Sequence, residues 1–176
     1  MVGLVISDTF LLSGVWSHDG ESPTLGKIVR IPYTENIAPL LHDEVELNSV
    51  LASALRQAKE NNSFDSENIV VGIPDSFVDH SVIENERDLS RDDLLDYIHW
   101  IEMQKETSSD REFSIYGQVY QPNETNIHVC NVPKSLIRTL KLSITEMGGN
   151  PFWMGPLSSL YLDGSGMSEA AIIERI

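Results

Sequence analysis

The stretch Val2–Trp16, VGLVISDTFLLSGVW, consists of two apolar runs separated by the polar residues Ser7-Asp8-Thr9. Short apolar runs rich in Val, Ile and Leu and bounded by turn-forming residues are typical of strands. Ser, Asp and Thr favour turns because their side chains can hydrogen-bond to nearby backbone groups. The stretch therefore predicts a β-hairpin, formed by residues 2–7 and 10–16, with a tight polar turn.

Residues 17–74 predict an α/β layer built on this hairpin. Gly26–Tyr33 alternates apolar and polar residues and is expected to form a third antiparallel strand. Asp43–Asn61 is expected to form a helix with Asp43 as its N-cap. Asn68–Pro74, NIVVGIP, is a continuous apolar run, as in a strand covered on both faces. The apolar stripe of the helix comprises Leu47, Val50, Leu51, Ala54, Leu55 and Ala58.

After Pro74 the pattern predicts a small β-α-β-β-α module that ends at Gly149. Its expected elements are a strand over 77–84, a helix from Ser90, strands over 112–120 and 126–132, and a helix from Pro133 that Gly148-Gly149 ends. The chain is then expected to return as a strand feeding a short helix over 150–162. A last helix is expected over Met167–Ile176.

Composition limits the classes of function. The chain has 176 residues, with 12 Lys and Arg against 27 Asp and Glu, which gives a net charge of −15. That charge repels nucleic acid and anionic membrane surfaces, so binding to either is not expected. A net negative charge of this size also keeps a protein soluble, and it is compatible with a basic protein partner. No apolar run approaches the ~20 residues of a membrane span, and no signal peptide is expected.

Three stretches, taken in order, resemble the first half of an actin-like ATPase. The opening VGLVISDTFLLSGVW is similar to the Val-Gly-Leu-Asp-Ile-Gly-Ser start of the family. VVGIPDSFVDHSVIE and the acidic LSRDDLLDYIHWIEMQ are similar to its core strand and the subdomain inserted after it. The third stretch is similar to the hairpin, helix and returning strand of the family; it comprises FSIYGQVY and the segment from NIHVCNV to SLYL. The resemblance is closest to the PilM family of type IV pilus assembly, with the FtsA family and the GspL family of type II secretion as relatives.

This resemblance implies a fold and its division into domains. The fold class is α/β, a ribonuclease-H-like, actin-like lobe that carries an inserted β-α-β-β-α subdomain. The lobe is expected to comprise residues 1–74 and 150–176, and the inserted subdomain residues 75–149. The chain corresponds only to the N-terminal half of such an ATPase.

The resemblance also locates a phosphate loop in the turn after the first strand. The family places there an Asp that organises a divalent cation, and a Gly that lets backbone amides approach the anion. In this chain Val5 stands at the Asp position and Ser7 at the Gly position. The turn is therefore expected to be structural. The alternative is that Ser7, Asp8 and Thr9 contact the phosphates of ATP-Mg, with the rest of the site supplied by a second lobe or a dimer partner.

No other catalytic or metal-binding constellation is expected. The five histidines show no pair at i, i+4 on a helix, and His99 with Glu102 is interpreted as a surface pair. Cys130 is the only cysteine, lies in an expected strand and is interpreted as a buried, unreactive thiol. We expect no catalytic residues and no bound metal.

Two classes of function remain. The first is a non-catalytic, actin-like scaffold or pseudo-ATPase of a pilus, secretion or division system, cytoplasmic and held at the inner membrane by a partner without inserting itself. The second is an ATP-binding protein or nucleotide switch. For the first, the resemblance implies a protein partner, such as the cytoplasmic tail of an inner-membrane pilus protein or a secretion ATPase; a homodimer is the other option. The expected partner-binding residues are Phe152, Trp153, Met154 and Leu157, because aromatic and Met side chains are enriched at interfaces.

Overall fold

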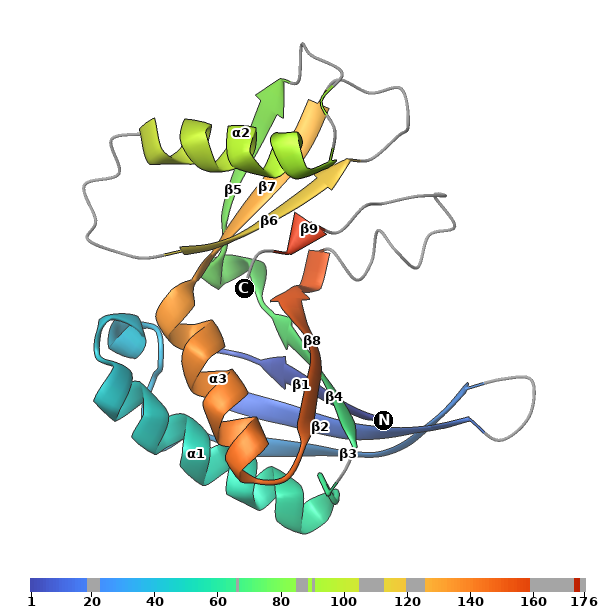
Figure 1. The fold of residues 1–176 in the computed structure, drawn as a ribbon. Coiled ribbons are helices and arrows are strands. Elements are labelled where there is room, and N and C mark those ends of the chain that lie inside the picture. The colour runs from blue at the N-terminus through green and yellow to red at the C-terminus, as the bar shows by residue number, and fades with distance from the viewer. Residues whose placement is uncertain are drawn as a thin grey trace. The chain divides into compact units, whose positions relative to one another are not determined.

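The computed structural model of the chain describes residues 1–18, 23–65, 67–84, 89, 91–104, 113–119, 126–158 and 173–174. The chain divides into two units (Figure 1). Unit 1 comprises residues 1–74 and 135–155, and unit 2 comprises residues 75–134 and 156–176.

Unit 1 is built on a mixed five-stranded sheet with the strand order β3-β2-β1-β4-β8. Strands β1 (Val2–Ile6), β2 (Phe10–His18) and β3 (Pro23–Pro32) form the expected antiparallel meander. Strand β4 (Asn68–Ile73) lies parallel to β1, with Gly3 opposite Val70. Strand β8 (Asn150–Pro156) completes the sheet beside β4.

Helix α1 (Glu44–Asn61), which follows the short 3-10 helix η1 (Pro39–His42), connects β3 to β4. It begins where Asp43 accepts hydrogen bonds from the amides of Val45 and Glu46, both at 3.1 Å, so the expected N-cap is confirmed. All six residues of its expected apolar stripe are buried. They cover the sheet face that carries Val2, Leu4 and Ile6, which are each 1% exposed.

Helix α3 (Lys134–Glu146) packs in unit 1 and not in the inserted module where we expected it. Three side-chain contacts join it to α1 and η1: Ser135 Oγ to the Leu41 carbonyl at 2.7 Å, Arg138 to Glu44 at 3.1 Å, and Ser143 Oγ to Asn48 at 3.1 Å. The physical reason is that α3 buries its apolar side chains in unit 1, while its polar side chains form hydrogen bonds with α1 and η1. The boundary expected at Gly149 therefore moves to the start of α3, and the described residues after Gly155 group with unit 2 instead of the lobe.

Unit 2 contains a second sheet with the order β5-β7-β6-β9. After the 3-10 helix η2 (Asp75–Phe77), strand β5 (Asp79–Glu84) pairs antiparallel with β7 (Asn126–Pro133), and β7 pairs antiparallel with β6 (Phe113–Val119). Helix α2 (Arg91–Gln104) packs on this sheet. The shared core comprises Ile83, Leu94, Ile98 and Val129.

The C-terminal region differs from its expected helix where the structure describes it. Ile173–Glu174 forms the short strand β9, which pairs antiparallel with β6. An isoleucine run favours a strand when a neighbouring sheet edge offers unpaired backbone groups. The rest of the expected helix over 167–176, and the residues expected as a helix after Ser158, lie outside the described residues.

Candidate functional site

The turn between β1 and β2 is closed by backbone hydrogen bonds. The Ser7 amide donates to the Phe10 carbonyl at 2.9 Å, and the Tyr33 amide donates to the Thr9 carbonyl at 2.9 Å. A third bond, also 2.9 Å, runs from the Ile37 amide to the Asp8 carbonyl. The segment after β3 therefore holds the turn in place from one side.

The side chains of this turn also interact with one another. The Ser7 hydroxyl donates to the Asp8 carboxylate at 2.9 Å, and both Asp8 and Thr9 are exposed. Val5, which the resemblance to actin-like ATPases aligns with their Asp, is half-buried and opposite Leu12 on β2. An aliphatic side chain offers no oxygen to a cation, and Asp8 is the acidic residue of the turn itself.

Tyr33 lies beside the same turn. Its hydroxyl oxygen is buried and has no hydrogen-bond partner among the described residues. Burial raises the pKa of Tyr33 well above its usual value, and the nearby Ser7 backbone offsets a small part of that rise. Tyr33 therefore stays neutral and contributes no charge to the turn.

The residues expected to bind a partner have different environments in β8 and just after it. Phe152 is 66% exposed, while Met154 is only 5% exposed and has little area to offer. Trp153 and Leu157 are half-buried. Of the four, only Phe152 therefore offers a largely exposed apolar side chain.

The sheet of unit 1 has a second face, which the two helices do not cover. Side chains alternate along strands, and the register places Val5 beside Leu12, and Gly14 beside Ile28. Trp16 and Leu25, which pair beyond a bulge, lie close to Gly3 and Gly14 on the same face. We call this the open face, and define it by Val5, Leu12, Trp16, Leu25, Ile28 and Val70.

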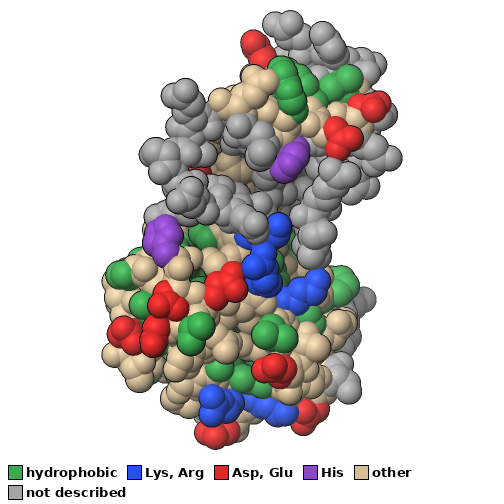
Figure 2. Space-filling view, turned by 60° about the vertical axis from the view of Figure 1, so that its left-hand side comes forward, with side chains coloured by type: hydrophobic (Ala, Val, Ile, Leu, Met, Phe, Trp, Pro, Cys, Tyr) green, Lys and Arg blue, Asp and Glu red, His purple; other side chains and the backbone are tan. Residues whose placement is uncertain are grey.

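The open face is apolar and accessible. Trp16, Leu25 and Ile28 are 40%, 43% and 56% exposed, and Val5, Leu12 and Val70 are half-buried. This surface was not predicted from the sequence, although the adjacent apolar residues Ile28 and Val29 indicate that both faces of the strand carry apolar side chains. By contrast, the side of the molecule shown in Figure 2 has acidic, basic and apolar side chains interspersed.

Unit 2 holds the single cysteine in a chain of polar contacts. The Cys130 sulfur lies 3.5 Å from His80 Nδ1, and His80 Nε2 lies 3.5 Å from Asp75. Cys130 is 2% exposed, and burial, together with the charge of Asp75, raises the pKa of its thiol to about 11. A nucleophilic cysteine has a lowered pKa and access to substrate, so this arrangement does not activate the thiol.

Within the described ranges, no cluster of three or more His, Cys, Asp or Glu side chains is arranged to hold a metal ion. In that same part of the chain, no helix is long and apolar enough to cross a bilayer.

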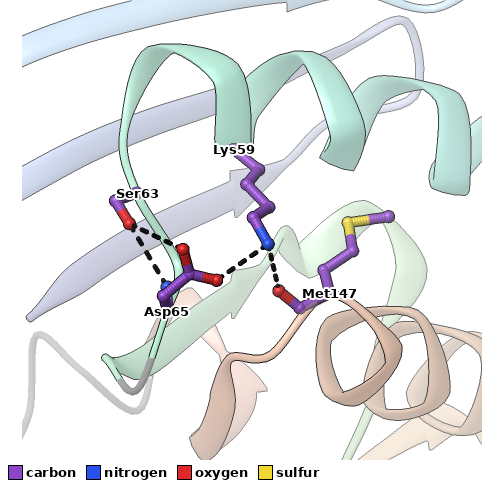
Figure 3. Close-up of polar contacts among 4 residues, drawn as sticks. All are labelled: Lys59, Ser63, Asp65 and Met147. Carbon is purple, nitrogen blue, oxygen red and sulfur yellow. Dashed lines mark hydrogen bonds and ion pairs between the residues drawn. The ribbon is translucent and has the colours of Figure 1, made fainter.

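A polar network in unit 1 joins the ends of α1 and α3 (Figure 3). Lys59 Nζ donates to Asp65 at 2.8 Å and to the Met147 carbonyl at 2.7 Å. Gly148 follows with a φ of +84°, the left-handed conformation that glycine adopts at a helix C-terminus. The network satisfies a carbonyl that α3 leaves unpaired at its end, so its role is structural.

The mixed five-stranded sheet of unit 1, interrupted after β4 by a second α/β unit, agrees with the actin-like ATPase fold expected from the sequence. The chain has this fold, and it resembles PilM and the type II secretion protein EpsL. The expected α/β, actin-like fold class is thus confirmed, while the last helix expected in the inserted subdomain, α3, belongs to unit 1. No family model matches the sequence, and no curated protein matches it.

Two solved structures are similar to this chain over most of its length. A PilM-PilN type IV pilus biogenesis complex matches with a TM-score of 0.61 at 15% identity, over 91% of this chain and 48% of that one. The cytoplasmic domain of EpsL, described as an inner-membrane component of the type II secretion system of Vibrio cholerae, matches with a TM-score of 0.54 at 14% identity, over 88% of this chain and 56% of that one. The chain therefore spans about half the length of these structures.

Proposed function

We propose that this protein is a non-catalytic interaction module with an actin-like fold, and that it serves a bacterial membrane-associated assembly system of the pilus or secretion type. In this proposal it acts in the cytoplasm, reaches the inner membrane through a protein partner, and needs no bound nucleotide. The likeness to proteins of a pilus complex and a secretion system supports the choice of system.

The observation that carries the non-catalytic part of the proposal is the β1–β2 turn. Val5 replaces the carboxylate that would organise a cation, and Ser7 replaces the glycine that would let backbone amides approach a phosphate. The Ser7 amide already donates to Phe10, and the Asp8 carboxylate already accepts a bond from Ser7. The Ser7 amide and the Asp8 carboxylate are thus already engaged in hydrogen bonds within the turn.

Thermal melting with and without millimolar ATP-Mg tests this part. A ligand that binds only the folded state stabilises it by about 2.7 kcal/mol at a hundredfold excess over Kd. For a chain of this size that corresponds to roughly 5–10 °C in Tm. We expect no shift.

A shift that disappears in Asp8→Ala would overturn the proposal and favour a nucleotide switch that uses Ser7, Asp8 and Thr9. Asp79→Ala, an exposed acidic residue of unit 2, is the matched control for the loss of one negative charge. A shift retained in both variants would also contradict a nucleotide-free role, and it would place the nucleotide away from the turn.

The partner is tested by co-expression with the cytoplasmic tail of an inner-membrane pilus or secretion component from the same genome. We expect a complex that survives size-exclusion chromatography in the absence of nucleotide. Failure with tails of both systems would contradict the assignment to such a machinery.

A further inference from the structure

The open face of the unit 1 sheet has the composition of a buried surface. The two central parallel strands, β1 and β4, read VGLVI and NIVVGI, continuous apolar runs that are typical of strands covered on both faces. Helices α1 and α3 lie on the same side of this sheet (Figure 1). Along the described strands, the opposite side therefore presents apolar side chains that a second layer would cover.

Alternation along β8 extends this surface. The Asn150 side-chain Nδ2 donates to the Asn68 side-chain oxygen Oδ1 at 2.6 Å, and Asn68 shares its face with Val70. Phe152, two residues after Asn150, therefore points to the open face, where it is 66% exposed. The apolar surface thus extends from the β3 edge of the sheet to the β8 edge.

Arg30 is the only charged side chain on this face among the described side chains of the strands. Its guanidinium lies 4.1 Å from the centre of the Phe10 ring. Stacking of this kind occupies the flat face of the guanidinium and leaves the N–H groups at its edge for a carboxylate. No described residue forms an ion pair with Arg30.

The charge distribution favours one class of occupant. A second copy of the chain, docked face to face, would bring two Arg30 side chains into one apolar interface without an acid, and each copy carries a net charge of −15. A helix of another protein with an apolar stripe and one carboxylate would cover the apolar side chains and pair with Arg30.

We propose that the open face docks an amphipathic helix of a protein partner, and that a carboxylate within the apolar stripe of that helix pairs with Arg30. The inference rests on the proposed role as an interaction module and names the surface and the chemistry of the partner. Ile28 and Leu25 anchor the stripe, and Arg30 fixes its register.

The test uses a labelled, designed amphipathic helix of 18 residues with one Glu in its apolar stripe, and the same peptide with Lys in that place. Fluorescence anisotropy measures binding to the full chain without nucleotide. We expect the Glu peptide to bind the natural protein at least about tenfold more tightly than the Lys peptide does. Arg30→Glu should reverse that preference.

Ile28→Glu should weaken binding of the Glu peptide about tenfold or more, because it places a charge among the anchors. Val45→Glu, the same kind of change at a side chain 78% exposed on α1, is the matched control and should leave binding unchanged. Circular dichroism establishes that each variant is folded.

Three results would overturn the inference: absence of binding by the Glu peptide, equal binding of the two peptides, or equal effects of Ile28→Glu and Val45→Glu. A fourth contradicting result would come from light scattering. If the natural chain is a dimer and Ile28→Glu converts it to a monomer, a second copy of the chain occupies the open face. None of these results depends on ATP, so they are distinguishable from failure of the nucleotide-free role.

Discussion

The ammonium group of Lys59 lies 2.7 Å from the carbonyl oxygen of Met147, a residue 88 positions later in the chain. This bond joins the last turn of α1 to the end of α3, and Asp65 holds the same ammonium at 2.8 Å. The Lys59 side chain thus connects the C-terminal ends of α1 and α3, the two helices that cover the sheet.

Lys59→Met should destabilise unit 1, because the Met147 carbonyl loses its charged donor while the aliphatic part of the side chain is retained. We expect a loss of about 1–2 kcal/mol in the free energy of unfolding. Urea unfolding followed by circular dichroism measures it. Lys27→Met removes an exposed bond to Asn61 and should cost less than about 0.5 kcal/mol. Equal losses in the two variants would argue against a special role of Lys59.

The pH dependence of stability should report the Lys59–Asp65 pair. The hydrogen bond and the charge of Lys59 lower the pKa of Asp65 below its ordinary value of 3.8. A lowered pKa contributes stability that is present above pH 3.8 and is lost as the pH falls through the folded-state value. Natural protein should therefore exceed Asp65→Asn in stability at pH 7, and this difference should vanish in strong acid. When Lys59 is replaced by Met, the stability difference between the protein with Asp65 and its Asp65→Asn variant should hardly depend on pH. A pH dependence that persists in this background would show that another group lowers the pKa of Asp65.

Cys130 should resist alkylation in the folded protein. Its thiol is 2% exposed and has a pKa of about 11, so little thiolate exists at pH 8 and reagents have no access to it. Iodoacetamide labelling followed by mass spectrometry should be slow in buffer and rapid in urea. Ser76→Cys in a Cys130→Ala background provides an exposed thiol of unit 2, which should react readily. Fast labelling of native Cys130 would contradict its burial.

Leu140→Ala should destabilise unit 1 selectively, because Leu140 is fully buried on the face of α3 that packs in that unit. A cavity of this kind costs about 2–5 kcal/mol. Hydrogen exchange should accelerate in α1 and β4 and remain unchanged in β5 and β7. Leu142→Ala, at a side chain 55% exposed on the same helix, is the control and should leave both units unaffected. Faster hydrogen exchange in β5 and β7 instead would indicate that α3 packs in the inserted module.

Local patterns were sufficient for much of the fold. The polar turn Ser7–Thr9, the Asp43 cap, the apolar stripe of α1 and the glycine end of α3 are all decided by neighbours within a few residues, and each was predictable. The resemblance to actin-like ATPases likewise located the β1–β2 turn as a candidate site and aligned Val5 and Ser7 with the family's Asp and Gly.

Long-range packing limited the prediction elsewhere. The stripe of α3 indicates an apolar helix but does not say which sheet it covers, because any apolar layer satisfies the same pattern. Its assignment to unit 1 depends on contacts such as Ser143 with Asn48, which lie 95 positions apart. For the same reason Ile173–Glu174 was expected in a helix and forms a strand, since the edge of β6 is absent from local sequence.

The sequence by itself determined the turn chemistry, the helix ends, the alternation of the strands and the strongly acidic charge, because these depend on residue type and on spacing of at most a few positions. Only the tertiary structure decided that α3 joins α1 on one face, and that Trp16, Leu25, Ile28 and Arg30 gather on the other. Strand register and helix packing bring distant residues together through burial of apolar surface, a cooperative effect that no short stretch contains.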